Sequence, residues 1–250
     1  MSSRSAALDR KKFDDLYDSF VIGAGFFESD NYYRLERERY WRSLQFFTRL
    51  PMPSPAHILE VGGGQLAVMS KHLFGDNCTV GDISNRFSAP LDRQGIPLIE
   101  CNLLSTEFPE AREQYDVLVL LEVIEHLPLP PYVVFERIKS FLKPGGLIFI
   151  TTPNLFRLRN LARMIAGVEF LDRFMLPMPG HGLGHQLEYT AEHLQWQFEQ
   201  AKLDLIFLEH DELGHVGHSP KARLARKLLK PLTARPRWRD ELVAAARKPG

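Results

Sequence analysis

The sequence predicts a doubly wound α/β fold with a mostly parallel sheet. From residue 57 onward, short apolar runs alternate with segments of helical spacing, which is typical of parallel strands joined by right-handed helical crossovers. The run at residues 117–121 is apolar without interruption, as expected for a strand that is buried on both faces. Three glycines at residues 62–64 close the first run and open a helical segment, so a tight turn is expected there.

The spacing of apolar residues places each element along the chain. Strands are expected at residues 57–61, 78–82, 96–101, 115–121, 147–152, 203–209 and 242–246. Helices are expected at residues 13–20, 32–50, 66–74, 131–142 and 191–201. Prolines at positions 51, 53 and 55 separate the first two helices from the first strand. We therefore interpret residues 1–55 as an N-terminal helical extension and residues 56–250 as the sheet domain.

Composition places the chain among globular proteins. Its 250 residues are 44% hydrophobic and 25% charged, and 31 basic residues balance 31 acidic ones, so net charge gives no argument for nucleic acid or an anionic membrane as partner. No apolar run approaches the roughly 18 residues of a transmembrane segment, and the N-terminus does not resemble a signal peptide. Cys78 and Cys101 lie in apolar runs that suit buried thiols, so a cytoplasmic location is expected.

A candidate nucleoside site lies at the carboxyl edge of the expected sheet. The first strand brings Glu60, Gly62, Gly63 and Gly64 to this edge, where open α/β sheets bind ligands and where glycines allow the backbone to approach closely. Asp82 ends the second strand twenty positions after Gly62, where an acid can accept hydrogen bonds from ribose hydroxyls.

Two cofactors fit this pattern. Gly62, Gly64 and Ala67 match the dinucleotide fingerprint with alanine at its last position, so a nicotinamide-dependent dehydrogenase is one alternative. Glu60 lies two residues before the first glycine, a poor place beside a pyrophosphate but a good one for the cationic amino group of a methionine moiety. The charge of Glu60 therefore favours S-adenosylmethionine.

Four segments resemble, in order, successive motifs of the class I S-adenosylmethionine-dependent methyltransferases. They are residues 58–64 (Ile-Leu-Glu-Val-Gly-Gly-Gly), Asp82, residues 115–127 and residues 142–154. The resemblance implies a Rossmann-like methyltransferase fold whose antiparallel seventh strand lies within residues 240–248. It also implies that Glu60, Gly62 and Gly64 line the methionine part of the cofactor, Asp82 the ribose, and Asn102 and Leu103 the adenine. The chain departs from the family pattern at Leu66, where a glycine is common, and at Asn102, where an aspartate is common.

The acceptor chemistry points to histidine. Transfer to a hydroxyl is helped by a general base, and a neutral imidazole suits this role near pH 7. His126 follows the fourth strand, and His185 precedes a helix that Thr190 can cap. If a helix begins after the fourth strand, Glu122 and His126 lie one turn apart on one face. We predict O-methylation of a small-molecule, sugar or lipid-linked acceptor. The candidate catalytic groups are His126, His185 and Glu122.

A metal site is the main alternative for these side chains. Glu122, Glu125, His126 and His185 resemble the metal ligands of the small-RNA 3′-terminal 2′-O-methyltransferases, which would make a terminal ribose the acceptor. The segment Glu-x-x-Glu-His also resembles that of superfamily members without a metal, so the sequence favours no metal. A cofactor-binding module without catalysis is a further alternative.

Two further segments are candidates for contact with a partner: a basic one at residues 221–239 and an apolar one at residues 170–179. Leucines 224, 228, 229 and 232 interleave with the basic residues at helical spacing, which favours an amphipathic helix packed on the sheet over an RNA-binding surface. An apolar stretch at residues 170–179 follows the fifth strand, where it is expected to cover the acceptor, contact another subunit or join the core. The basic residues are Lys221, Arg223, Arg226, Lys227, Lys230, Arg235, Arg237 and Arg239.

Overall fold

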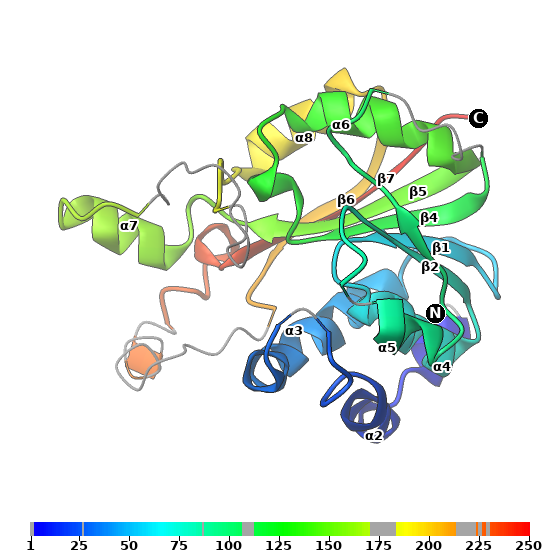
Figure 1. Ribbon diagram of the computed structural model, residues 1–250. Coiled ribbons are helices and arrows are strands. Elements are labelled where there is room, and N and C mark those ends of the chain that lie inside the picture. The colour runs from blue at the N-terminus through cyan, green and yellow to red at the C-terminus, as the bar shows by residue number, and fades with distance from the viewer. Residues whose placement is uncertain are drawn as a thin grey trace.

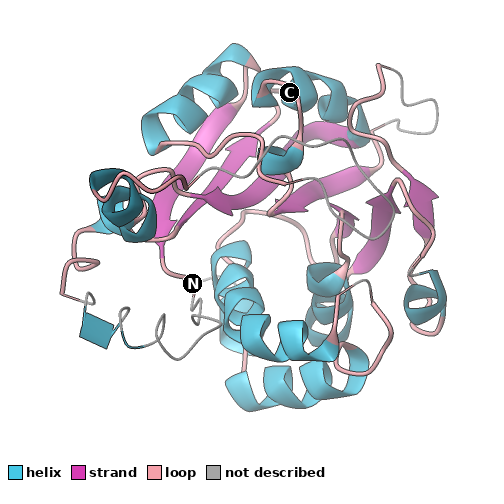
Figure 2. Cartoon of the chain, turned by 60° about the vertical axis from the view of Figure 1, so that its left-hand side comes forward, coloured by secondary structure: helices cyan, strands magenta, loops and turns pink. Residues whose placement is uncertain are grey.

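The computed structural model describes residues 3–26, 28–86, 88–106, 113–170, 184–213, 224, 227–228 and 231–250. These residues form three layers, in which one sheet lies between two layers of helices (Figures 1 and 2). The predicted α/β fold is thereby confirmed. The strands of the sheet are β1 (His57–Val61), β2 (Asn77–Asp82), β3 (Leu98–Glu100), β4 (Tyr115–Leu121), β5 (Leu142–Pro153), β6 (Asp204–Asp211) and β7 (Glu241–Arg247).

The strand order creates a crevice for a ligand. The seven strands lie in the order β3-β2-β1-β4-β5-β7-β6, and β7 runs antiparallel to both of its neighbours. The first three strands extend from β1 to one side, whereas β4 begins the other side, so the order reverses between β1 and β4. Open α/β sheets bind ligands at the carboxyl ends of the strands beside such a reversal.

Helices cover both faces of the sheet. Figure 1 shows α2 to α5 on one face and α6 and α8 on the other, while α7 extends away from the body. The rings of Phe47 in α3 and Phe149 in β5 lie 5.6 Å apart, so the N-terminal helices share a core with the sheet. The division at residue 55 stays a prediction. The helices are α1 (Ser3–Ala7), α2 (Arg10–Phe20), α3 (Asp30–Phe47), α4 (Gln65–Phe74), α5 (Ser88–Asp92), α6 (Pro131–Ile138), α7 (Leu158–Ile165) and α8 (Ala191–Gln200).

Alternation along the strands builds two apolar cores. Val117 and Val119 join the core beneath the N-terminal helices, whereas Leu118 and Leu120 join the core beneath α6 and α8. All four side chains are fully buried because successive side chains of a strand point to opposite faces and both faces are covered. This central strand holds the segment after Leu121 firmly at the carboxyl edge.

Several boundaries differ from those predicted. The third strand begins at Leu98 and not at residue 96, because Pro97 has no N–H and contributes only its carbonyl, which accepts from Val80. The helix expected to end at residue 142 ends at Ile138 and continues as the 3₁₀ turn η2 (Lys139–Phe141). A short 3₁₀ turn, η1 (Ile124–His126), follows β4, so the helix considered from Glu122 onward does not form.

The basic segment is described only in part. Leu224, Leu228 and Leu232 are 60%, 71% and 42% exposed, so the expected packing of these leucines on the sheet is wrong for the residues described. Residues 214–223, 225–226 and 229–230 lie outside the described part, as do residues 171–183, which include most of the predicted apolar stretch. Within the described ranges, no helix has both the length and the apolar character needed to cross a membrane.

Candidate active site

The glycine turn after β1 has a backbone that only glycine adopts readily. Gly62, Gly63 and Gly64 have φ values of 80°, 69° and 92°, all in the left-handed region. A Cβ on Gly64 would lie 3.0 Å from the Val80 side chain of β2. These glycines therefore let the chain turn sharply into α4 at the carboxyl edge of β1.

The side chain of Glu60 stabilises the glycine turn by a hydrogen bond to the start of α4. Its side chain is buried, and its Oε2 accepts a hydrogen bond of 2.6 Å from the backbone N–H of Ala67 in the first turn of α4. Burial raises the pKa of Glu60 to about 7, although backbone N–H groups of the turn and helix act against this shift. A cation bound beside Glu60 would favour its charged form, as the predicted role toward the methionine amino group requires.

The predicted ribose and adenine residues lie together at the ends of β2 and β3. Asp82 is half-buried and accepts from the backbone of Ser84, and its own carbonyl accepts from Cys101. Burial raises the pKa of Asp82, and the N–H groups of Ser84 and Ile83 oppose this. Next along the chain, Asn102 is exposed and Leu103 is buried. The Asn102 side-chain oxygen accepts from Leu104 at 3.0 Å, so the oxygen expected to accept from adenine already has one partner.

The turn after β4 faces the glycine turn. A Cβ on Gly62 would lie 3.3 Å from Val123, which places this turn directly against the end of β1. Glu122 has a φ of 55°, and its Oε1 accepts 2.7 Å from the Thr151 hydroxyl of β5. Because Glu122 is held in a left-handed conformation, it does not share a helical face with His126.

His126 and His185 meet at this edge although 59 positions separate them in the sequence. Their ring centroids lie 4.9 Å apart at 77°, and the two side chains are 30% and 28% exposed. The backbone N–H of Gln186 donates to the Glu125 carbonyl at 2.6 Å and so ties the two segments together. Single ligand atoms of Glu125, His126 and His185 all lie within 4.8 Å of one another. Glu122 is not part of this group, so the structure brings together three of the four candidate metal ligands.

An ionised carboxylate orients His185. This carboxylate belongs to Glu188, whose Oε1 lies 3.3 Å from the Nδ1 atom of His185. The Asn160 amide donates to Glu188 Oε2 at 2.6 Å. Arg157 forms an ion pair with the same carboxylate. Burial alone would raise the pKa of Glu188, but the His185 hydrogen bond, the Arg157 charge and the Asn160 amide outweigh it and lower the pKa.

Two further buried acids lie at this edge of the sheet. Glu125 is fully buried, and burial together with the negative charge of Glu122 raises its pKa well above the usual range. Glu241 begins β7 opposite Pro153 of β5, and its pKa is raised by burial and by the charge of Glu122. Arg39 of α3 and Arg157 act on Glu241 in the opposite direction.

Sequence reasoning assigned no role to Arg39, Arg157, Glu188 or Glu241. The spacing of His185 and Glu188, three residues apart, is the one local signal that could have identified a carboxylate beside the imidazole. Glu241 gives no local signal because only the antiparallel course of β7 brings its first residue to the carboxyl edge of β5.

A family model described as a methyltransferase domain matches residues 33–207, which is more than half of the chain. The chain belongs to the methyltransferase domain family. The predicted placement in the class I S-adenosylmethionine-dependent methyltransferase superfamily, with its Rossmann-like sheet, is thereby confirmed. Membership in this family favours S-adenosylmethionine as cofactor over the nicotinamide alternative.

The chain is similar to curated enzymes in sequence and to solved structures in fold. A ubiquinone biosynthesis O-methyltransferase of Shewanella pealeana is 33% identical over 133 residues, which are 50% of this chain and 54% of that enzyme. The chain thus aligns with about half the length of the curated relatives it matches. An S-adenosylmethionine-dependent methyltransferase structure from Mesorhizobium loti has a TM-score of 0.55 at 16% identity, covering 84% of this chain and 98% of that one. Another from Archaeoglobus fulgidus has a TM-score of 0.57 at 15% identity, covering 86% and 97%. These two structures show the fold alone.

Proposed function

We propose that this methyltransferase transfers the methyl group of S-adenosylmethionine to a hydroxyl oxygen of a small-molecule, sugar or lipid-linked acceptor. The observation that carries the proposal is His185, which an ionised carboxylate orients at the same sheet edge as the glycine turn. The similarity to enzymes named ubiquinone biosynthesis O-methyltransferases supports oxygen as the methylated atom.

Different residues of the chain bind the cofactor and take up the proton of the acceptor. S-adenosylmethionine supplies a methyl group on a sulfonium, and the carbon–sulfur bond breaks as the carbon–oxygen bond forms. Glu60 and the glycine turn would hold the cofactor, and Asp82 would accept hydrogen bonds from its ribose hydroxyls. With Nδ1 donating to Glu188, the Nε2 atom of His185 takes the proton of the acceptor hydroxyl, and Glu188 stabilises the resulting imidazolium. Alignment of the hydroxyl with the methyl carbon supplies much of the remaining rate.

A methyl-transfer assay tests the role of His185. A catechol, a hexose and a polyprenyl-phosphate sugar are offered separately with S-adenosylmethionine, and release of S-adenosylhomocysteine is counted. With an accepted hydroxyl compound, we expect His185→Gln to lower kcat by about 10²- to 10⁴-fold, the usual contribution of a general base. His57→Gln, at an exposed position at the start of β1, is the matched control. Equal rates for the two variants would contradict His185 as the base.

A metal-dependent ribose methyltransferase is the second candidate, because Glu125, His126 and His185 lie close enough to bind one ion. One carboxylate and two imidazoles suit a divalent transition metal, and the buried Glu125 Oε1 has no hydrogen-bond partner in the described part of the chain. These three residues would hold the ion, which would lower the pKa of a bound hydroxyl. Glu122, whose Oε1 accepts from the Thr151 hydroxyl, does not belong to this group of three.

Chelation separates the two candidates. The hydroxyl-transfer proposal predicts that protein stripped with EDTA retains its activity toward the accepted compound. The metal candidate predicts no activity after stripping, recovery with Mn²⁺, and metal-dependent binding of an RNA with a free 3′-terminal diol.

The cytoplasmic location stays a proposal, as does a small molecule in place of nucleic acid as the partner. The cytoplasmic location is supported by Cys78 and Cys101, because both are buried free thiols, as suits a reducing compartment.

A further inference from the structure

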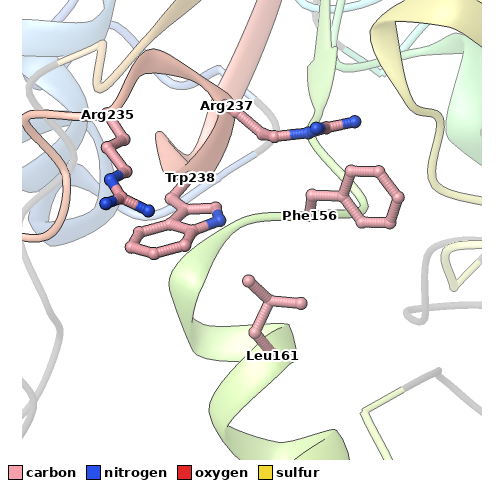
Figure 3. Close-up of a pocket in the computed structure, with 5 residues that line it drawn as sticks. All are labelled: Phe156, Leu161, Arg235, Arg237 and Trp238. Carbon is pink, nitrogen blue, oxygen red and sulfur yellow. The ribbon is translucent and has the colours of Figure 1, made fainter.

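Figure 3 shows a pocket of about 380 Å³ between the segment after β5 and the 3₁₀ turn η3 (Pro236–Trp238), which precedes β7. Its two arginines stack on different rings. Arg235 lies 5.0 Å from the centroid of the Trp238 ring. Arg237 lies 5.4 Å from that of Phe156, and the two guanidinium groups are directed away from each other (Figure 3). The polar groups of this pocket therefore do not converge on one ligand.

Polar side chains do converge where α3 contacts α4, on the face of the sheet that both helices cover (Figure 1). Tyr33 and Tyr40 lie seven residues apart, which is about two helical turns, and so share one face of α3. Both contact the side chain of Gln65, the first residue of α4. The Tyr40 hydroxyl donates to Gln65 Oε1 at 3.2 Å, and Gln65 Nε2 donates to the Tyr33 hydroxyl at 3.3 Å. Two tyrosines of the N-terminal helices thus hold one amide at both of its ends.

Burial makes these two hydrogen bonds matter. Gln65 is 2% exposed, and Tyr33 and Tyr40 are 3% and 6% exposed, so water has little access as a replacement partner. Burial raises the pKa of Tyr33 to about 12 and that of Tyr40 well above its usual range, which keeps both hydroxyls protonated. A buried amide that lost one partner would bear the cost of an unpaired polar group. The two tyrosines therefore fix the position of the Gln65 side chain.

This side chain lies directly against the glycine turn. A Cβ on Gly63 would lie 2.6 Å from Gln65 Oε1 and 3.9 Å from Glu60 Oε1. The amide of Gln65 and the carboxylate of Glu60 thus lie on the same side of Gly63. A shift of Gln65 would change the space beside the middle glycine of the turn. One side chain therefore connects the tyrosines of α3 to the backbone at the carboxyl edge of β1.

We propose that Tyr33 and Tyr40 are positioning residues for the cofactor, which act through Gln65 to hold Gly63 in its ligand-binding position. The helices before β1 then form part of the cofactor site in addition to covering the sheet. Because Gln65 joins the two parts, cofactor binding and the packing of α3 against α4 stabilise each other. The inference rests on the proposed contact between the glycine turn and S-adenosylmethionine.

Removal of single hydroxyl groups tests the inference with little change in shape. Calorimetry measures the affinity of the full chain for S-adenosylmethionine, and thermal unfolding without cofactor measures Tm. We expect Tyr33→Phe and Tyr40→Phe each to weaken binding by about 3- to 10-fold, the value of one neutral hydrogen bond. Tyr17→Phe is the matched control, because Tyr17 is also buried and its hydroxyl donates to the Tyr33 carbonyl at 3.0 Å and not to Gln65. This control should lower Tm and keep the affinity within about twofold of wild type.

A double-mutant cycle separates positioning through Gln65 from a general loosening of the helices. Gln65→Met keeps the length of the side chain and removes both hydrogen bonds, so it should weaken binding at least as much as Tyr40→Phe. In the Gln65→Met background, Tyr40→Phe should have little further effect. Additive losses, unchanged affinity of Tyr33→Phe and Tyr40→Phe, or an equal loss in Tyr17→Phe would overturn the inference and leave the cofactor site standing. Absence of binding by wild type would contradict the cofactor site itself, and the inference with it.

Discussion

At the scale of single residues, Glu60 links the cofactor site to pH. Burial raises the pKa of its carboxyl to about 7, so its protonated and ionised forms exchange near neutral pH. The cationic amino group of the cofactor favours the ionised form of Glu60, so binding near this residue releases a proton wherever Glu60 is protonated.

We therefore expect the affinity for S-adenosylmethionine to rise as the pH increases from about 5.5 toward 8. Below the pKa of Glu60, the rise approaches tenfold per pH unit at most, because one proton is released for each ligand bound. Calorimetry at several pH values in two buffers measures both the affinity and the proton release. Glu60→Gln should bind more weakly and show a flatter profile, whereas parallel profiles for the two proteins would remove Glu60 from the site.

Glu241 provides a second prediction at this scale. Its pKa is raised in the folded protein, so the stability it contributes is present below the ordinary glutamate pKa and is lost as the pH rises above that value. We expect Glu241→Gln to have a higher Tm than wild type at pH 8 and a Tm close to wild type at pH 4.5. Thermal unfolding across this range tests the sign, and a variant less stable at pH 8 would contradict it.

At the scale of elements, one ion pair fastens the short helix α1 to the domain. Arg4 and Asp76 have side chains that are 3% and 0% exposed, and the two guanidinium nitrogens lie 2.5 and 2.6 Å from the two carboxylate oxygens. Asp76 also accepts from the Ala56 backbone and from the Ser70 hydroxyl. The pair thus joins α1, the start of β1 and α4.

Removal of one partner of this pair should be costly. We expect Arg4→Met to lower the free energy of unfolding by about 3–5 kcal/mol, because it leaves the Asp76 carboxylate buried without its cation. Arg10→Met breaks surface ion pairs with Asp14 and Glu38 and should cost less than about 1 kcal/mol. Urea denaturation of both variants measures the difference, and equal losses would show that burial of the first pair has no consequence.

Element prediction from the sequence succeeded where the local pattern controls the structure. The run at residues 117–121 gave the central strand because its apolar residues fit a sheet covered on both faces. The turn after it was not predictable in the same way. Glu122 takes a left-handed conformation while Thr151 binds its side chain, and that contact joins residues 29 positions apart.

At the scale of the whole molecule, the sheet topology gathers the candidate site from distant segments. Glu60, the glycines and Asp82 were predictable because they end neighbouring parallel strands, and such ends share one edge. The partners of His185 could not be predicted from the sequence, because Glu188 and Arg157 meet only after the segments beyond β5 fold back onto β4. The same holds for Glu241, which depends on the antiparallel insertion of β7 between β5 and β6.

The most direct test of the account is a calorimetric titration with S-adenosylmethionine of wild type, Asp82→Ala and Asp204→Ala. Asp204 is an exposed acid at the start of β6, away from the carboxyl edge, and serves as the matched control. We expect wild type and Asp204→Ala to bind alike, and Asp82→Ala to lose about 1–3 kcal/mol of binding free energy with its ribose hydrogen bonds. Absence of binding by wild type, or unchanged binding by Asp82→Ala, would contradict the cofactor site described at the ends of β1 and β2.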